Sequence, residues 1–410
     1  MTEWKTYRLG EICKRVCSGG TPKSTEPSYY DGDIPWLNTK EINFNRIYST
    51  ERCITQKGLD NSSAKWIDAN CVIVAMYGAT AAKVAINKIP LTTNQACCNL
   101  SIDEKIADYR FVYYWLCFNY TNLASLANGG AQQNLNAQQI KDFEISLPSL
   151  EEQRRIARIL GAIDDKIENN RRINTNLELQ AQALYKQWFV DFDFPNEEGK
   201  PYKSSGGKMV DSELGIIPES WSVIGYCDVV DIKGGGTPPT NNPEFWNGSI
   251  PFFTPKDVSS DCFVLKTEKS ITEAGLSNCN SRLYAKNTVF ITARGTVGKV
   301  VMAGCSMAMN QTNYALIGKN ELSQYFVYLL TIALVDRLLK KANGAVFNAI
   351  TTRDFEGERI VHPTNFVLGK FIDIISPLYQ QVLSIAKENE TLATLRDTLL
   401  PKLMNGEIKL

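Results

Sequence analysis

Residues Leu147–Pro195 read LPSLEEQRRIARILGAIDDKIENNRRINTNLELQAQALYKQWFVDFDFP, and this stretch decides the organisation of the chain. Apolar residues recur along it at the spacing of one helix face; they are Ile156, Ile159, Ile163, Ile167, Ile173, Leu177, Leu184 and Trp188. Ser149 followed by Glu152 is a capping-box pattern, which predicts that a helix begins here. About 40 helical residues at ~1.5 Å each would form a rod of about 60 Å.

Three polar residues, Lys166, Asn170 and Gln180, fall within this apolar stripe. Such positions fix the register of helices in coiled coils. The alternative interpretation is one long core helix of a single globular domain. Its length argues against that, because helices in globular domains average only ~11–12 residues.

A second helical stretch closes the chain, from Phe366 to Leu403. Its stripe consists of Phe371, Ile374, Leu378, Val382, Ile385, Leu392, Leu395 and Leu399. Pro377 lies inside it, where a proline removes a backbone hydrogen bond and favours a kink. The two stretches can bury their stripes against each other. We expect the helix–helix contact to be made by Ile156, Ile163, Leu177, Leu184, Phe371, Leu378, Ile385, Leu392 and Leu399.

The rest of the chain is duplicated. Residues 19–42 read GGTPKSTEPSYYDGDIPWLNTKEI, and residues 235–258 read GGTPPTNNPEFWNGSIPFFTPKDV, an offset of 216 without a gap. Further matches follow at offsets of 215 to 217, among them Asn94-Gln95 with Asn310-Gln311. The predicted organisation is therefore a head at 1–146, a helix at 147–194, a connector at 195–218, a second head at 219–362 and a second helix at 363–410. Cys71–Ala75 and Thr288–Thr292 are predicted strands, and Tyr109–Phe118 and Ser323–Lys340 are predicted helices, so each head is of mixed α and β structure.

Composition is that of a globular protein. The chain has 410 residues, 44% of them hydrophobic and 21% charged, and a formal net charge of +0. The neutral balance argues against non-specific polyanion binding as the main role. Eleven cysteines without a Cys-x-x-Cys motif, and no signal peptide at Met1, predict a reducing, cytoplasmic location. The longest apolar run, Tyr325–Val335, is too short for a membrane span.

Catalytic motifs are missing. His362 is the only histidine, which argues against a histidine-based triad or metal site. Gly295–Lys299 (GTVGK) faintly resembles a phosphate loop but lacks its first glycine and its Ser/Thr. Asn242–Phe245 (NPEF) partly resembles the tetrapeptide of adenine methyltransferases but lacks its second proline. We interpret both as loop residues and expect no catalytic or metal-binding residues in this chain.

The heads carry side chains that suit DNA. Asn and Gln can bond adenine bidentately and Arg can bond guanine, whereas Lys can bind phosphates. Gln132, Gln133, Asn134, Asn136, Gln138 and Gln139 crowd one segment, and its counterpart holds Asn343, Phe347, Asn348, Thr351, Thr352 and Arg353. The expected DNA contacts are Thr21, Lys23, Lys40, Lys83, Gln132, Gln133, Asn134, Thr237, Lys256, Arg294, Lys299, Asn343, Phe347, Asn348 and Arg353. The alternative is that these Asn and Gln residues merely fill loops and cap helices.

Several motifs together resemble the specificity (S) subunit of type I restriction–modification systems, over essentially the whole chain. They are the Gly-Gly-Thr-Pro…Ile-Pro opening of each head, Pro148–Gln153 (PSLEEQ), Phe192–Pro195 (FDFP) with Ser204–Gly207 (SSGG), and Leu395–Pro401 (LRDTLLP). The second copy departs from the first, because Phe252-Phe253 replaces Trp36-Leu37 and no Glu-Glu-Gln follows Pro363.

The resemblance implies two target-recognition domains separated by an antiparallel pair of long coiled-coil helices with an internal pseudo-two-fold repeat. Each domain would read half of a bipartite double-stranded DNA target. The helices would dock two modification (methyltransferase) subunits, and restriction (translocase–nuclease) subunits could join them. S-adenosylmethionine, ATP and Mg are expected on those partners, with no cofactor on this chain and no contact with a membrane.

Two alternatives stay open at this point. A self-sufficient methyltransferase or nuclease would need a donor or metal motif, which a cofactor-binding titration would reveal. A coiled-coil scaffold that binds only proteins would explain the helices, but it would not explain why the heads are duplicated yet divergent in their polar loops. A DNA footprint distinguishes it.

Overall fold

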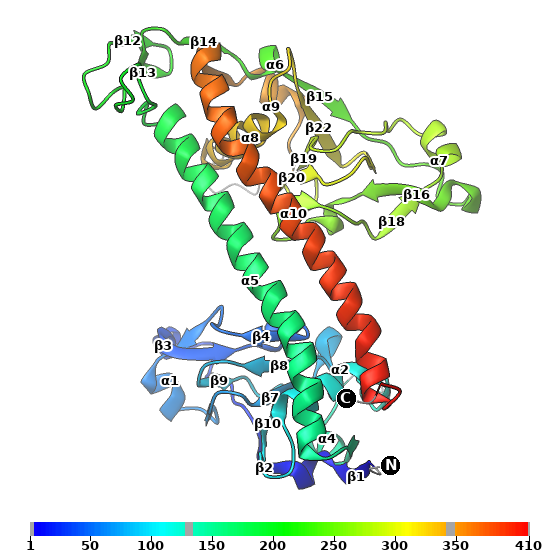
Figure 1. Cartoon of the computed structure of the whole chain (residues 1–410). Helices are drawn as coiled ribbons and strands as arrows, with labels where there is room; N and C mark the ends of the chain where they lie inside the picture. The colour runs from blue at the N-terminus through cyan, green and yellow to red at the C-terminus, as the bar shows by residue number, and fades with distance from the viewer. Residues whose placement is uncertain (1–3, 128–133, 342–348, 409–410) are drawn as a thin grey trace. The chain divides into compact units, whose positions relative to one another are not determined.

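The computed structural model of the chain describes residues 4–127, 134–341 and 349–408. It divides into two compact units, each with a mixed α/β head (Figure 1). Unit 1 comprises Met1–Lys166 with Leu392–Leu410, and unit 2 comprises Ile167–Thr391. Each unit therefore includes a part of both long helices. The predicted fold class, two mixed heads in an internal repeat with a pair of long helices, is confirmed.

The head of unit 1 is built on two sheets. Its five-stranded sheet has the order β2-β10-β7-β8-β4, with β2 at Cys13–Ser18, β10 at Cys97–Ile102, β7 at Val72–Ala75, β8 at Val84–Asn87 and β4 at Asn45–Ile47. Its four-stranded sheet has the order β5-β3-β9-β6, with β5 at Cys53–Ile54, β3 at Tyr30–Leu37, β9 at Leu91–Thr93 and β6 at Trp66–Ile67. The central strand β7 is entirely buried, as its run of β-branched residues predicts.

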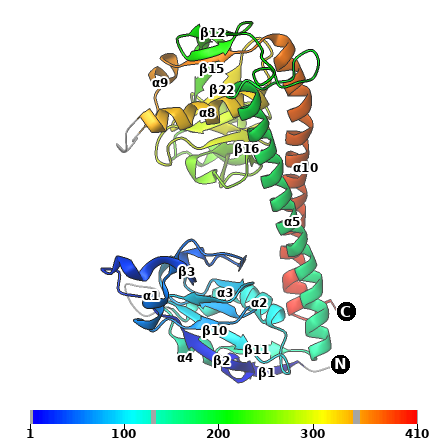
Figure 2. The same cartoon turned by 90° about the vertical axis from the view of Figure 1, so that its left-hand side faces the viewer.

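Short helices and a terminal strand pair complete this head. Strands β1 (Lys5–Arg8) and β11 (Glu144–Leu147) pair antiparallel, and the helices are α1 (Gln56–Asp60), α2 (Tyr109–Phe118), α3 (Tyr120–Ser125) and α4 (Ala137–Asp142). Helix α2 has the bounds predicted for it. It packs between the sheet and the start of the first long helix (Figure 2), and Phe111 and Tyr114 enter a core shared with Leu160.

The head of unit 2 repeats this topology. Its five-stranded sheet has the order β15-β22-β19-β20-β17, with β15 at Val230–Gly234, β22 at Asn313–Gly318, β19 at Val289–Thr292, β20 at Val300–Ala303 and β17 at Phe263–Val264. A three-stranded sheet has the order β18-β16-β21, with β18 at Lys269–Ile271, β16 at Trp246–Phe253 and β21 at Ala308–Met309. In both heads the edge strand of the larger sheet (β4 or β17) pairs parallel.

The remaining elements of unit 2 are the strand pair β14 (Ser222–Gly225) with β23 (Arg359–His362), the hairpin β12 (Met209–Ser212) with β13 (Gly215–Pro218), and helices α6 (Tyr226–Val229), α7 (Glu273–Ser277), α8 (Gln324–Lys341) and α9 (Thr352–Glu356).

The hairpin of β12 and β13 lies in the predicted connector. Aromatic contacts order this connector, because Phe194 stacks on Tyr202 and on Trp221 with centroids 4.7 and 4.9 Å apart. Asp193 accepts hydrogen bonds from the backbone N and hydroxyl of Ser204 at 2.8 and 2.6 Å, and these bonds lower its pKa.

The two long helices are α5 (Leu150–Phe189) and α10 (Asn365–Met404), each of 40 residues. Helix α5 begins where the capping pattern predicts, since Ser149 Oγ accepts from the backbone N of Glu152 at 3.3 Å. Helix α10 runs through Pro377 as one element. In unit 2 they pack antiparallel: Asn170 Nδ2 donates to Glu388 Oε2 at 2.8 Å, and Asn174 Nδ2 donates to the carbonyl of Val382 at 3.2 Å.

Asn170 is buried and also donates to Asn389 Oδ1 at 2.9 Å. It is therefore the polar interruption of the stripe that the sequence predicts, because a shift along the helix would leave its amide buried and unpaired. Lys166 and Gln180, the other two polar residues of the stripe, are exposed.

Aromatic packing fixes both helices to the head of unit 2. Phe189 of α5 contacts Phe371 of α10 edge to face with centroids 4.7 Å apart, and it contacts Phe326 of α8 at 5.1 Å. Trp188 and Tyr185 of α5 also contact Phe371. Such pairs contribute about 0.5–1.5 kcal/mol each beyond the area that they bury.

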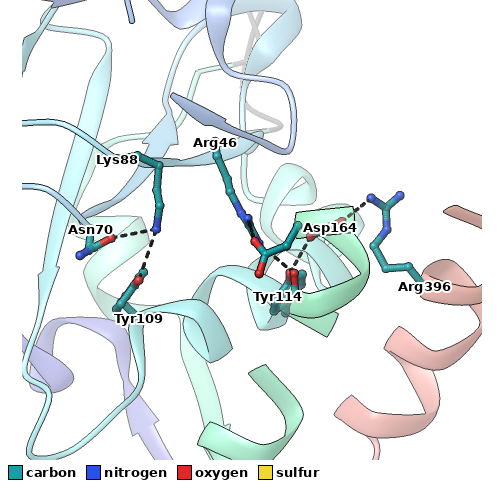
Figure 3. A network of polar contacts seen from close by, with 9 residues as sticks. Arg46, Asn70, Lys88, Tyr109, Tyr114, Asp164 and Arg396 are labelled. Carbon is teal, nitrogen blue, oxygen red and sulfur yellow. Dashed lines mark hydrogen bonds and ion pairs between the residues drawn. The ribbon is translucent and has the colours of Figure 1, made fainter. Parts of the chain in front are cut away.

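Polar contacts fix the helices to the head of unit 1. Asp164 of α5 accepts from the hydroxyl of Tyr114 of α2 at 2.5 Å and from Arg396 Nη1 of α10 at 2.9 Å (Figure 3). Burial alone would lower the pKa of Arg396, but Asp164 and Asp397 raise it. Arg46 of β4 pairs with Asp165. Asp164 thus joins a head helix to both long helices and accounts for the arginine in the terminal motif.

Gln153 explains the motif at the start of α5. Its side chain is 1% exposed, and Oε1 accepts from the backbone N of Asp108 at 3.0 Å. Its Nε2 donates to the carbonyl of Pro148 at 3.0 Å and faces that of Ile106 at 3.4 Å. Helix α10 has Leu368 at the repeat-equivalent position, so this attachment is present once, in unit 1.

Most residues predicted for the helix–helix contact are withdrawn from solvent. Ile156 and Phe371 are buried, and the others are half-buried: Ile163, Leu177, Leu184, Leu378, Ile385, Leu392 and Leu399. Two members of the wider stripe are exposed instead, Ile374 at 42% and Leu395 at 47%. Near Ile374, it is Ile375 and Tyr379 that are buried. The buried face of α10 therefore departs from the predicted stripe at these two positions, because α10 must contact the head as well as α5.

Within the described parts of the chain, no helix combines the length and hydrophobicity needed to cross a bilayer.

Glu178 of α5 should make the stability of unit 2 depend on pH. Tyr328 donates to its Oε1 at 2.7 Å, and burial raises its pKa above the ordinary 4.5. Because the folded state prefers the protonated form, this contribution to stability is complete below the ordinary pKa and is lost as pH rises through the raised one. We expect Glu178→Gln, which keeps the acceptor for Tyr328, to raise the thermal midpoint at pH 7 and to flatten its dependence on pH above 4.5. Calorimetry between pH 4 and 7.5 measures this.

The matched control is Glu268→Gln, which neutralises an exposed carboxylate of the same unit and should leave the midpoint unchanged. A lower midpoint for Glu178→Gln at pH 7 would contradict the expectation.

Candidate nucleic-acid interface

In unit 2 the Gly-Gly-Thr-Pro segment lies against the Asn310-Gln311 turn. A Cβ added to Gly235 would stand 2.2 Å from the carbonyl O of Asn310, so only glycine allows this approach of two backbones. Thr237 Oγ1 donates to the side chain of Gln311 beside it. Two segments more than 70 residues apart, both singled out by the repeat, are thereby brought together.

The loop after β19 joins the same site. The backbone N of Ala293 donates to the carbonyl of Thr312 at 2.9 Å, and that of Ile350 donates to the carbonyl of Ala293 at 2.9 Å. Arg294 and Ala349 then form an antiparallel bridge. Three segments therefore meet at the end of the central strand β19: the loop of residues 293–299, the Asn310-Gln311 turn and the segment that leads into α9.

Unit 1 reproduces these contacts with different residues. Met76 N donates to the carbonyl of Ala96 at 2.8 Å, and Leu135 N donates to the carbonyl of Met76 at 2.7 Å. Tyr77 and Asn134 form the antiparallel bridge. We call this hydrogen-bonded arrangement the recognition frame: residues 76–83, 94–96 and 134–135 in unit 1, and residues 293–299, 310–312 and 349–350 in unit 2.

Backbone conformation in the loop of each frame is also shared. Gly78 and Gly295 have φ of 69° and 80°, and Ala82 and Gly298 have φ of 66° and 82°. These values lie in the left-handed region, which glycine adopts freely and alanine does not. The loop joins antiparallel strands in both units, β7 to β8 and β19 to β20. It is thus no phosphate loop, which would lead from a strand into a helix.

The lysines that we expect to bind DNA phosphates differ in their surroundings. Lys23, Lys256 and Lys299 are exposed. Lys83 Nζ donates to Asn43 Oδ1 at 2.8 Å, and Lys40 pairs with Glu51. Exposed ion pairs of this kind are weak, so the ammonium of Lys40 can exchange its partner for a phosphate at little cost.

The predicted base-reading residues fall into two groups. Thr21, Asn134, Arg294 and Arg353 are exposed, Thr237 is half-buried, and of these Asn134 and Arg294 stand on the recognition frames. A second group lies outside the described residues and consists of Gln132, Gln133, Asn343, Phe347 and Asn348.

Four more residues of the same polar segments, which are not among the expected DNA contacts, make local contacts. Asn136 and Gln139 form a reciprocal capping box at the start of α4, with both hydrogen bonds at 2.9 Å, and Thr351 caps α9 through Asp354. Gln138 bonds Asp142. For these the alternative interpretation, helix capping, is the better one.

Sequence reasoning missed Tyr77 and Gln311 as site residues. Both had a signal, because Tyr77 is the repeat counterpart of Arg294, and Gln311 belongs to the matched Asn-Gln turn. The sequence does not reveal that the loop after the central strand (residues 76–83 or 293–299) is hydrogen-bonded to the Asn/Gln-rich segment or to its counterpart in unit 2.

No group of three or more His, Cys, Asp or Glu side chains placed to hold a metal ion occurs among residues 4–127, 134–341 and 349–408. Asn242, the first residue of the methyltransferase-like tetrapeptide, caps a short 3-10 helix by accepting from Glu244 N at 3.1 Å. Burial lowers the pKa of His362, which belongs to β23 and is not a residue of the recognition frame. The capping bond of Asn242 and the burial of His362 are therefore those of residues with a structural role.

Residues 1–179 and 218–393 match the family model described as the type I restriction modification DNA specificity domain. The chain belongs to this family. The two matched segments correspond to the two halves of the repeat. As a specificity subunit, the chain is a non-catalytic component, which confirms the prediction drawn from its motifs.

Two relatives match over nearly their full length. The specificity subunit of the type I restriction enzyme MjaIX from Methanocaldococcus jannaschii is 30% identical over 416 residues, covering 99% of this chain and 94% of the relative. That of HindI from Haemophilus influenzae is 24% identical and covers 100% of both. The crystal structure of an S subunit from M. genitalium has a TM-score of 0.58 at 17% identity, covering 98% of this chain and 96% of that one, a likeness of fold.

The adjacent glycines Gly234 and Gly235 allow a direct test of the frame. Gly235→Ala places a Cβ against the backbone of Asn310, and we expect it to destabilise unit 2 by about 1–3 kcal/mol, the usual cost of overpacking. Gly234→Ala meets nothing within 4 Å and should be neutral or slightly stabilising. Chemical denaturation of the two variants measures the difference. Equal stability of both would show that the close approach is not required.

Proposed function

We propose that this chain is the DNA-reading subunit of a type I restriction–modification complex, in which each head reads one half of a bipartite double-stranded target. One observation carries the proposal: both heads hold the same recognition frame, yet the side chains that it exposes differ. Two identical binding surfaces would need identical side chains, whereas two different half-sites need a constant backbone with variable contacts.

The chemistry of the exposed residues suits this role. Arg294 and Arg353 offer the paired donors that guanine accepts in the major groove, and Asn134 offers the donor–acceptor pair of adenine. Lys23, Lys83, Lys256 and Lys299 supply sequence-independent phosphate contacts that position each head. A net charge of zero fits such local contacts, because overall attraction to DNA would otherwise favour non-specific binding.

In this proposal α5 and α10 have two tasks. Their antiparallel pairing sets the spacer between half-sites, and their outer surfaces dock two modification subunits. S-adenosylmethionine binds to those subunits, and ATP and Mg to a restriction subunit where one joins. The complex acts in the cytoplasm, where the cell's DNA is accessible. Two features support the role in setting the spacer: the buried hydrogen bonds of Asn170 and the attachment of each helix to a head. Both make the helical pair stiff.

Exchange of one head should change one half-site. Residues 1–146 replaced by the matching part of a relative should alter one half of the methylated sequence and leave the other unchanged. The contact of Gln153 uses the backbone of Ile106 and Asp108, so a new head with that backbone can be accommodated. Sequencing of methylated adenines in cells with the full complex measures this. The control is exchange of residues 219–362, which should alter the other half, and a change of both halves after one exchange would refute the two-head proposal.

Lengthening the helical pair should lengthen the spacer. Four residues inserted after Asn170, with four matched near Glu388, add about 6 Å at ~1.5 Å per residue, or nearly two base pairs at ~3.4 Å. They also turn each helix by about 40° beyond a full turn, against roughly 34° per base pair of DNA. We therefore expect weaker recognition of a target whose spacer is one or two pairs longer, with unchanged half-site letters.

Methylome sequencing of the lengthened variant measures spacer and letters together. The matched control inserts four residues between Glu197 and Glu198, an exposed part of the connector outside both helices, and should leave the spacer unchanged. An active lengthened variant with the original spacer would show that the helices do not set it.

A further inference from the structure

Tyr77 is an exposed aromatic residue on a rigid support. Its side chain is 44% exposed, although residues Val72–Met76 before it are all buried. Single exposed aromatic side chains are common on protein surfaces, so what singles out Tyr77 is its position on the recognition frame, which the equally exposed Trp66 does not share. The bridge to Asn134 holds its backbone in place.

Arg294 occupies the same point of the second frame. Each of the two residues directly follows the residue whose N and O make the frame hydrogen bonds, and each precedes a glycine with positive φ. Corresponding hydrogen bonds differ by at most 0.2 Å between units, 2.8 against 2.9 Å and 2.7 against 2.9 Å. The two side chains therefore leave equivalent backbone positions.

No side-chain contact within the described residues gives Arg294 a structural role. Its side chain is exposed, and among residues 4–127, 134–341 and 349–408 it makes neither an ion pair nor a side-chain hydrogen bond. An arginine that fastened the loop would pair with a carboxylate or a carbonyl, as Arg396 does with Asp164. The five donors of its guanidinium are thus available to a ligand.

We propose that Tyr77 and Arg294 are the equivalent specificity-determining residues of the two heads, and that Arg294 reads a guanine in the major groove. This inference rests on the proposed function. A guanidinium can donate to O6 and N7 of guanine together. Tyr77 offers one hydroxyl and an apolar ring, which suits the methyl group of thymine and gives no such preference for guanine. The half-site of unit 2 therefore contains a guanine that the equivalent position of the other half-site lacks.

The experiment uses the full complex of this chain with its modification subunits and double-stranded DNA in which both half-sites are randomised. Bound sequences are selected and counted, and affinity is measured against salt. Arg294→Ala should lower the preference for guanine at one position of one half-site by about 5- to 150-fold, the range for a bidentate base contact. Every other letter should stay the same. Lys286→Ala is the matched control, because it removes one positive charge at the opposite end of β19 and should change no letter.

A second variant tests for a gain of specificity, a result that loss of folding could not produce. Tyr77→Arg should create a guanine preference of at least about 5-fold at one position of the other half-site. Trp66→Arg is its control, since Trp66 is also 44% exposed but lies on β6, outside the recognition frame, and should create none.

Two results would overturn the inference. One is that both variants leave all letters unchanged. The other is that Arg294→Ala weakens all sequences alike and lowers the salt slope by about one, which would mark a phosphate contact. Either could occur while exchange of a whole head still changes one half-site, so the proposed function would survive. If head exchange changes no half-site, the proposed function itself fails.

Discussion

Burial of two 40-residue amphipathic helices is the constraint on which the rest of this structure depends. Neither helix can leave its stripe in water, and each finds two partners: the other helix and a head. The start of α5 completes the core of unit 1 through Ile156 and Leu160, together with Leu403 and Met404 from the end of α10. The core of unit 1 thus includes residues from both ends of the chain, so it cannot be finished until the last helix has been made.

Specific polar contacts decide where along their length the helices are held. Apolar stripes tolerate sliding, because one leucine can replace another at a contact. Asn170, Gln153 and Asp164 do not tolerate it, since each is withdrawn from water and would lose a hydrogen bond, at about 1–3 kcal/mol for each buried group left unpaired. Unit 2 adds to the polar contact of Asn170 the shape of the aromatic cluster around Phe189 and Phe371. The two units fix the same helices by partly different means.

Much of this could be predicted from the sequence because duplication supplies an internal comparison. The offset of 216 residues located both heads, and the turn at Gly19 and Gly235 was conspicuous because only glycine permits the backbone contact. Periodicity found both helices but misjudged the face of α10 at Ile374 and Leu395, since a helix with two partners buries more than one stripe. Composition alone does not separate capping amides such as Asn136 and Gln139 from base-reading ones, because both uses need the same groups. Sequence reasoning misses Tyr77 although the repeat aligns it with Arg294, because only the fold shows that its loop is hydrogen-bonded to the Asn/Gln-rich segment.

The recognition frame separates two properties that most binding sites combine. Its stability resides in backbone hydrogen bonds and in the glycines Gly78 and Gly295, which depend little on the neighbouring side chains. The side chains through which we propose that it reads DNA, such as Tyr77 and Arg294, are exposed instead of packed in the core. A substitution there changes what is contacted without the core penalty of several kcal/mol that buried positions carry. A protein whose role is to recognise one sequence among many can change its target while retaining its fold, and the divergence of the two heads on a common frame is what such a separation produces.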